Sequence, residues 1–224
     1  MNEKKVPVLT IDGPSGAGKG TIAQMLALDL KWNILDSGAL YRTLAYFMLE
    51  KDINLSQFEE KKEYIKKNFM VKFDPGTVGE PVKVIFNNTD ITKEVRTEEI
   101  AKKTSDLAAD PIIREFIKPC QRDFMKKPGL IADGRDMGTV IFRDAKYKIF
   151  LTASLEERAK RRKVQLKRQG TEVNMRLLLQ ELEDRDKKDI ERKHSPLKPA
   201  SDSVIIDTSN LKPEGVVEEI KKIL

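Results

Sequence analysis

Short apolar runs alternate with longer stretches of helical periodicity along most of the chain. The runs lie at residues 6–11, 33–35, 130–132, 148–151 and 204–206. Their nearly continuous apolar character is typical of strands that helices cover on both faces. Because helical patterns separate the runs, they predict an α/β fold whose core is a five-stranded parallel sheet flanked by helices. Ligands of such sheets bind beyond the carboxyl ends of the strands.

A long insertion, residues 37–110, interrupts this pattern. It begins with helical periodicity and then alternates apolar and polar positions between residues 69 and 92. Turn residues at 74–76 and 87–88 divide the alternating part. The insertion therefore predicts a small antiparallel sheet planted on the core.

A second insertion, residues 154–170, is short and basic. Ser154 and Glu157 have the spacing of a capping box, which predicts that a helix begins there. The last stretch, residues 213–224, predicts a closing helix whose inward positions are Val216, Val217, Ile220 and Ile223.

Composition limits the classes of protein to which the chain can belong. It has 224 residues, of which 39% are hydrophobic and 35% charged, as in soluble globular proteins. We expect no membrane span and no signal peptide, and Cys120, the single cysteine, fits a reducing cytoplasm. The formal net charge of +6 leaves two interpretations open, polyanion binding or a site that gathers phosphates.

The residues after the first apolar run form a glycine-rich turn before a helix, with the sequence Gly-Pro-Ser-Gly-Ala-Gly-Lys-Gly-Thr at 13–21. Glycines let backbone N–H groups surround a phosphate, and a helix N-terminus adds positive potential. Lys19 can then reach the outer phosphates of a nucleoside triphosphate. We expect the contacts to ATP to come from Gly13, Ser15, Gly16, Ala17, Gly18, Lys19, Gly20 and Thr21.

One position departs from the usual P-loop pattern, which has Ser or Thr directly after the lysine. Gly20 stands there in this chain, and Thr21 follows it. We therefore expect Mg²⁺ to be held mainly by phosphates and water. Asp133, which follows the third apolar run, is the expected protein contact to the metal, made through water.

Two more motifs follow predicted strands, Asp-Ser-Gly-Ala-Leu-Tyr-Arg at 36–42 and Asp-Gly-Arg-Asp-Met-Gly at 133–138. Arg42 and Arg135 bring guanidinium groups, which suit phosphate, to one edge of the sheet. Asp136 adds an acceptor for a base or a ribose. An isolated surface Arg–Asp pair would mean little, but two such motifs at neighbouring strand ends predict a second, phosphate-bearing substrate.

The motifs together resemble those of bacterial cytidylate kinases of the long type, nucleoside monophosphate kinases with a β insert. The resemblance rests on residues 12–21, 36–42, 132–138 and 148–151, and it spans essentially the whole chain. It implies transfer of the γ-phosphoryl group of ATP to CMP or dCMP, with Mg²⁺. We expect no nucleic acid or membrane partner, and we expect a monomer because nothing in the sequence demands more. It also implies a domain division: a nucleoside monophosphate (NMP)-binding domain at 37–110, a lid at 154–170, and a P-loop core at 1–36, 111–153 and 171–224.

Roles for individual residues follow from the resemblance. Lys19, Arg135 and Arg185 would act on the transferred phosphoryl group. Three arginines of the lid, Arg158, Arg161 and Arg162, would close over ATP. The residues implied on the acceptor side are Ser37, Arg42, Ser105, Arg114, Arg135, Asp136, Arg185, Asp189 and Arg192. The acceptor phosphate is already an anion, so we expect no general base.

Two alternatives stay open. The basic helix of the second insertion is also compatible with a P-loop ATPase that binds nucleic acid. The acceptor is also compatible with UMP, AMP or another monophosphate. A GTPase is disfavoured because neither Asp-x-x-Gly nor Asn-Lys-x-Asp follows the P-loop.

Overall fold

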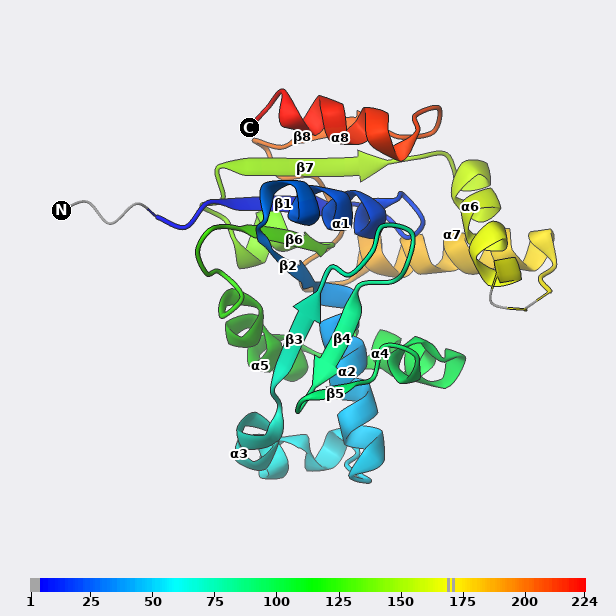
Figure 1. Cartoon of the computed structure of the whole chain (residues 1–224). Coiled ribbons are helices and arrows are strands. Elements are labelled where there is room, and N and C mark those ends of the chain that lie inside the picture. Colours follow the sequence, from blue (N-terminus) through cyan, green and yellow to red (C-terminus); the bar gives the residue numbers. More distant parts are fainter. Residues whose placement is uncertain (1–4, 169, 171) are drawn as a thin grey trace.

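A parallel sheet of five strands organises the chain, in the order β2-β6-β1-β7-β8 (Figure 1). The computed structural model describes residues 5–168, 170 and 172–224. The strands confirm the predicted α/β fold, and they are β1 (Val8–Asp12), β2 (Asn33–Asp36), β6 (Leu130–Gly134), β7 (Tyr147–Thr152) and β8 (Val204–Asp207).

Helices cover both faces of this sheet. On one face α1 (Lys19–Leu30) and α8 (Pro213–Lys221) pack on alternate strand residues, so that Leu9 and Ile11 share a cluster with Leu26 and Ile220. On the other face lie α2 (Ser37–Glu50), α5 (Pro111–Arg122) and a π-helical turn at Met137–Ile141. The strand interiors are therefore apolar on both sides, as the uninterrupted runs predict.

The edge strand β8 is the exception. The run at 204–206 predicts a buried strand. The strand is present, but the prediction that it is buried is wrong, because Val204 is 42% exposed and Ile205 58% exposed. β8 pairs with β7 alone among the described strands, so one of its sides faces away from the sheet. An apolar run thus identifies a strand without fixing its place in the sheet.

The predicted small antiparallel sheet is confirmed. It consists of β3 (Val71–Asp74), β4 (Lys83–Phe86) and β5 (Thr89–Asp90). Asn87 and Asn88 connect β4 to β5 with φ angles of 48° and 67°, as in a mirror-image hairpin turn. Around the sheet lie η1 (Leu55–Gln57), α3 (Phe58–Asn68), η2 (Glu94–Arg96) and α4 (Glu98–Ala109).

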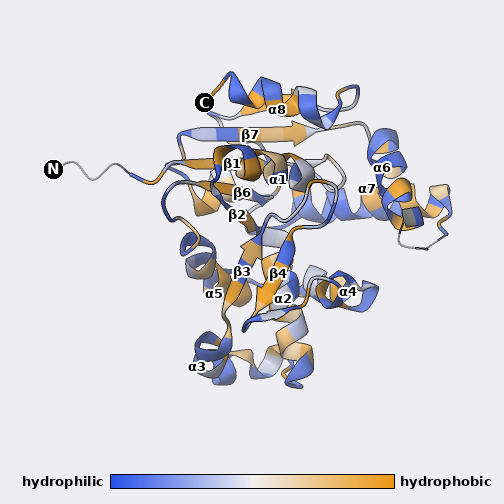
Figure 2. Cartoon of the chain, in the orientation of Figure 1, coloured by the Kyte–Doolittle hydropathy of each residue, from blue (hydrophilic) through white to orange (hydrophobic). Residues whose placement is uncertain are grey.

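The insert does not have a separate core. Val84 and Phe86 of the small sheet belong to the same buried cluster as Val8 and Leu130 of the large sheet. In Figure 2 the hydrophobic colour runs from the strands of the large sheet into β3 and β4. The insert is thus built onto the core, while the domain division at residues 37 and 110 stays a prediction.

The second insertion begins as predicted. The Oγ of Ser154 accepts the backbone N–H of Glu157 at 3.2 Å, and α6 (Leu155–Arg168) follows. The capping box is only half formed, because the Glu157 carboxylate pairs with Arg161 at 3.3 Å and the Ser154 N–H donates to Ser209. α7 (Met175–Glu191) packs against α6. Residue 169 of the predicted lid lies outside the described residues. Among the described residues, no helix combines the length and the apolar character needed to cross a bilayer.

Candidate active site

The loop between β1 and α1 curls into a cradle at the carboxyl edge of the sheet. Gly13, Gly16 and Gly18 have φ angles of 148°, 80° and 89°, a region that favours glycine. A Cβ on Gly13 would lie 2.1 Å from the carbonyl oxygen of Leu151, so no other residue fits there. Successive backbone N–H groups in such a loop form an anion-binding concavity before the N-terminus of α1. The residues present therefore fit the phosphates of a nucleotide.

Lys19 is the first residue of α1, and its side chain lies against this cradle. Its Nζ donates a hydrogen bond to the carbonyl of Pro14 at 2.9 Å, and the residue is 7% exposed. Burial lowers the pKa of Lys19, and the nearby Arg135 lowers it further. An anion in the cradle would offset this effect, because a nearby negative charge favours the protonated form of the ammonium group.

Two carboxylates, Asp12 and Asp133, lie beside Lys19. Burial raises the pKa of Asp133, and a Cβ on Gly20 would lie 3.5 Å from its Oδ2. Asp12 accepts the backbone N–H groups of Met137 and Gly138 at 2.8 Å each, and burial raises its pKa to about 6. Both carboxylate oxygens of Asp12 are thus occupied by backbone N–H groups, whereas Asp133 is the carboxylate placed next to Lys19.

The described residues contain no group of three or more His, Cys, Asp or Glu side chains arranged to hold a metal ion. A divalent cation at the cradle would therefore depend on phosphate oxygens and water for most of its ligands, as Mg²⁺ commonly does. The contact of Mg²⁺ with Asp133 through water stays a prediction.

The arginines of α6 reach the rim of the cradle. Arg158 is buried, donates to the carbonyl of Ser15 at 3.1 Å and forms an ion pair with Asp186 of α7 at 2.6 Å. Arg161 donates to the hydroxyl of Thr208 at 2.9 Å, in the loop after β8. Arg158 and Arg161 are therefore tied to the core in this conformation, while Arg162 contacts Gln165 on its own helix. Their closure over ATP stays a prediction.

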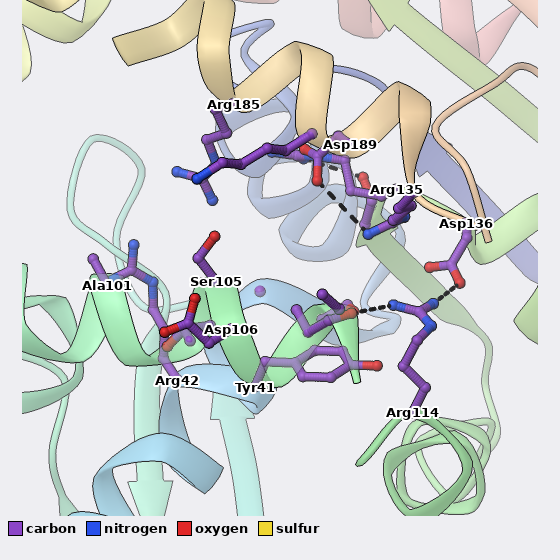
Figure 3. Close-up of a pocket in the computed structure, with 18 of the residues that line it drawn as sticks. Tyr41, Arg42, Ala101, Ser105, Asp106, Arg114, Arg135, Asp136, Arg185 and Asp189 are labelled. Atoms are coloured by element: carbon purple, nitrogen blue, oxygen red, sulfur yellow. Dashed lines mark hydrogen bonds and ion pairs between the residues drawn. The ribbon is translucent and has the colours of Figure 1, made fainter. Parts of the chain in front are cut away.

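A cavity of about 590 Å³ opens beside the cradle, between the large sheet, α2, α4 and α7 (Figure 3). It is bounded by Lys19 and Asp133 on the side of the cradle. All nine residues expected on the acceptor side line it, although they come from segments far apart in the chain: Ser37, Arg42, Ser105, Arg114, Arg135, Asp136, Arg185, Asp189 and Arg192. The structure thus brings the expected acceptor residues together, while the role of each stays a prediction.

Ion pairs join several of the charged side chains of this cavity. Arg114 and Asp136 form a buried pair in which the side chains are 8% and 5% exposed. Arg135 and Asp189 form a second pair, with Nε and Oδ2 2.8 Å apart. Burial raises the pKa of Asp189, but the charge and hydrogen bond of Arg135 and the charge of Arg192 outweigh burial, so the net shift is downward.

Arg185 differs from these residues because no described residue forms a hydrogen bond or an ion pair with its side chain. Burial and the nearby Arg135 lower the pKa of Arg185, although a guanidinium stays charged at neutral pH. Its side chain extends over the cavity from α7 (Figure 3). Arg185, Arg42, Arg135 and Lys19 thus place several cations around one space, an arrangement that favours a multiply charged anion.

Two residues that sequence reasoning missed hold the acceptor cavity together. The Nε2 of Gln121, a buried residue of α5, donates to the Oγ of Ser37 at 2.8 Å. Tyr41 lies under the guanidinium of Arg114, 6.0 Å from its ring centroid. Gln121 follows Arg114 by seven positions, so helical periodicity puts both on one face, and that spacing is the signal that could have found it.

A phosphate cradle that opens onto a second, arginine-rich cavity defines a P-loop phosphotransferase. The comparisons with known proteins give the particular group: the chain belongs to the cytidylate kinase family, whose model matches residues 9–224. It is 46% identical to a cytidylate kinase of Stutzerimonas stutzeri over 217 residues, 97% of this chain and 94% of that protein. It is 48% identical to a cytidylate kinase of Shewanella frigidimarina over 220 residues, 98% of this chain and 95% of that protein.

Solved structures give a more distant likeness. A shikimate kinase from Bacteroides thetaiotaomicron aligns over 97% of both chains with a TM-score of 0.45 and 12% identity. That likeness is too distant to bear on the activity.

Proposed function

We propose that this protein transfers the γ-phosphoryl group of ATP to CMP or dCMP, giving ADP and CDP or dCDP. The observation that carries the proposal is the single cavity that nine acceptor-side residues line next to Lys19. The cytidylate kinase names of relatives that are 46% and 48% identical over nearly the whole chain support the same acceptor.

On the donor side, the backbone N–H groups of residues 15–19 hold the outer phosphates of ATP. Lys19 places its ammonium at the γ-phosphate, where charge gathers in the transition state. Asp133 would help to hold a bound Mg²⁺ through water, and the cation would supply positive charge that neutralises part of the charge of the phosphates. Asp133 orients water next to Lys19, and closure of α6 over the nucleotide excludes the water that would otherwise take the phosphoryl group.

On the acceptor side, Arg42, Arg135 and Arg185 hold the phosphate of the monophosphate in line with the γ-phosphate. Phosphoryl transfer needs alignment and positive charge more than covalent chemistry. The acceptor oxygen belongs to an ionised phosphate, so no side chain has to remove a proton. The proposed contacts to base and ribose come from Ser37, Ser105, Arg114, Asp136, Asp189 and Arg192.

A P-loop ATPase that binds nucleic acid fits the structure less well. The guanidinium groups of Arg158 and Arg161 point to Ser15 and Thr208 rather than along an exposed stripe. Binding of a phosphate backbone needs such a continuous basic surface.

The experiment is an ADP-release assay with ATP and Mg²⁺ and, in parallel, CMP, dCMP, UMP, AMP, single-stranded RNA or no acceptor. We expect turnover with CMP and dCMP and almost none without an acceptor. Turnover that needs RNA, or that is fastest with UMP or AMP, would contradict the proposed acceptor while leaving the P-loop assignment intact.

We also propose that the enzyme works as a cytoplasmic monomer. The cradle and the acceptor cavity are both complete within one chain, and the single cysteine allows no internal disulfide. Sedimentation equilibrium at micromolar concentration tests the monomer, and location by fluorescent fusion tests the compartment.

A further inference from the structure

A buried glutamine joins the P-loop helix to the β insert. Gln24 of α1 is 2% exposed, and its Nε2 donates to the carbonyl oxygens of Pro75, Thr77 and Glu80, the last two at 3.1 and 3.0 Å. All three carbonyls lie in the loop between β3 and β4. An amide has two N–H hydrogens, so the three acceptors share them. One side chain thus binds most of this loop to α1.

The loop is shaped to present these carbonyls. The Oδ1 of Asp74 accepts the N–H of Gly76 at 2.8 Å, and the N–H of Glu80 donates to the carbonyl of Thr77 at 3.1 Å. Val82, at the end of the loop, is buried in the apolar cluster that contains Ile22 and Leu26 of α1. The contact therefore has a polar part and an apolar part, and both meet the same helix.

Hydrogen bonds continue from this loop to the acceptor cavity. Arg96 of η2 donates to the carbonyl of Val82 at 2.9 Å and to the carbonyl of Thr92 at 2.7 Å. The carbonyl of its neighbour Val95 accepts a hydrogen bond from Arg42 at 3.1 Å. Arg42 lines the acceptor cavity. A continuous set of contacts thus runs from α1 through the insert to an arginine of the site.

We propose that Gln24 is a positioning residue for the acceptor subsite, which it serves by holding the β3–β4 loop on α1 and thereby fixing Arg42 in the cavity. This inference rests on the proposed function, because it takes Arg42 as a contact to the acceptor phosphate. The β insert then links α1, the helix that begins at Lys19, to Arg42, the proposed contact to the second substrate. Alignment of two reacting phosphates is sensitive to displacements of about 1 Å, so loss of the contact between Gln24 and the β3–β4 loop should change the kinetics directly.

The test separates an acceptor effect from a donor effect. Gln24 lies five residues after Lys19 on the same helix, so a residue that acted through its own helix would change the KM for ATP. A residue that acts through the insert changes the KM for CMP instead. We therefore measure kcat and both KM values for Gln24→Glu, which keeps the size of the side chain but turns a carboxylate toward three carbonyl oxygens, and for the apolar Gln24→Met.

Gln57→Glu is the matched control. It is the same chemical change within the same insertion, at a side chain whose Oε1 accepts the N–H of Asn54 at 3.0 Å. A glutamate at position 57 keeps that acceptor. We expect both Gln24 variants to raise the KM for CMP about tenfold with the KM for ATP changed less than about twofold, and Gln57→Glu to change neither. An equal rise of both KM values, or a rise for ATP alone, would overturn the inference.

A double-mutant cycle tests whether the effect passes through Arg42. In the Arg42→Ala background, Gln24→Glu has no arginine left to displace, so it should raise the KM for CMP no further. Full additivity of the two changes would overturn the proposed route. If neither Gln24 variant folds, Arg96→Gln interrupts the same contacts without touching α1, and it must then show the acceptor-selective rise.

Hydrogen exchange gives a readout that does not depend on the substrate. The backbone of the loop at 75–82 should exchange faster in Gln24→Glu than in the wild type or in Gln57→Glu. Faster exchange with an unchanged KM for CMP overturns the positioning role alone. A wild-type protein that does not phosphorylate CMP overturns the proposed function, and the exchange result then still decides whether Gln24 holds the loop.

Discussion

The donor cradle and the acceptor cavity lie side by side but are built in different ways. The cradle comes from one continuous stretch, in which glycines with positive φ shape the backbone and Lys19 bonds to Pro14 of the same loop. The acceptor cavity takes side chains from α2, α4, α5, α7 and the end of β6. The cradle is therefore set by local backbone geometry, whereas the cavity exists only when distant segments have packed together.

The two regions also differ in how their charges are balanced. Lys19 of the cradle forms no ion pair with a described residue, but Arg114 and Arg135 of the cavity each have a carboxylate partner within it. The Arg135–Asp189 pair is 19% exposed on both sides, so a phosphate that enters the cavity competes with Asp189 for Arg135. Acceptor binding would thus exchange ion pairs, whereas donor binding would fill a cradle that is already shaped.

The largest expected effect is on the donor side. Lys19→Ala removes the ammonium from the cradle, and we expect kcat to fall about 1,000-fold because transition-state charge loses its partner. Stability should change little, since the pKa of Lys19 is lowered by burial and the charged side chain is not stabilising there. Steady-state kinetics and urea unfolding measure the two quantities.

Lys62→Ala is the control for that variant, because Lys62 is a residue of α3 whose side chain is 41% exposed and pairs with Glu59. It should keep the kcat of the wild type. A Lys19→Ala enzyme with normal kcat would contradict the assignment of the cradle as the donor site.

The next effect is on stability and belongs to the acceptor side. Asp136→Asn removes the charge that faces Arg114 in a pair whose side chains are 8% and 5% exposed. A buried arginine without a carboxylate partner costs about 3 kcal/mol, so we expect the free energy of unfolding to fall by about that amount. Asp29→Asn is the matched control: its pair with Lys221 has side chains 47% and 42% exposed, and it should cost less than about 1 kcal/mol. If both variants lost the same free energy of unfolding, the buried pair of the cavity would be no more important for stability than the exposed pair on the surface.

The difference in construction also explains how much the sequence predicted. The P-loop could be predicted because its glycines, its lysine and the helix start are adjacent in the chain, so local geometry alone gives the site. The parallel strands could be predicted from their apolar runs, although β8 is exposed because its place at the edge depends on the order of the strands. The places of Arg42 and Arg135 at the edge of the cavity could be predicted because each lies in a motif that follows a strand.

The contacts that hold the acceptor cavity could not be predicted in this way. Gln121 meets Ser37 across 84 positions of the chain, and Gln24 meets the β3–β4 loop across 51 or more. Neither glutamine lies in a recognisable motif, and their functions depend on which carbonyl or hydroxyl the fold places opposite them. Likewise, the ion pair of Arg158 and Asp186 forms only because α6 packs on α7.

A smaller kinetic effect distinguishes the two regions by substrate. Asp189→Asn removes the partner of Arg135 and a proposed contact to the ribose, so we expect the KM for CMP to rise about tenfold while the KM for ATP stays within about twofold. Parallel titrations of each substrate at saturating levels of the other give both values. A rise confined to ATP would move Asp189 to the donor side and would erase the distinction between the regions.

The smallest effect is a pH dependence of the donor cradle. Burial and Arg135 lower the pKa of Lys19 in the free enzyme from the ordinary value of 10.5, so the lysine loses its proton, and with it the affinity for phosphate, at a lower pH than an exposed lysine would. We therefore expect kcat/KM for ATP to fall a few-fold as the pH rises above neutrality. This basic limb of the pH profile reports the pKa of Lys19 in the free enzyme.

The limb should lie at higher pH in the profile of kcat, because a bound phosphate favours the protonated form of Lys19. Lys19→Arg should lose the limb altogether, since a guanidinium stays charged throughout this range, even if its activity is lower. The kcat/KM profile for CMP at saturating ATP should lack the same limb, because Lys19 is then already paired with the donor. A limb of equal position in all three profiles would mean that another group titrates, and that the cradle is not under the electrostatic stress that its burial implies.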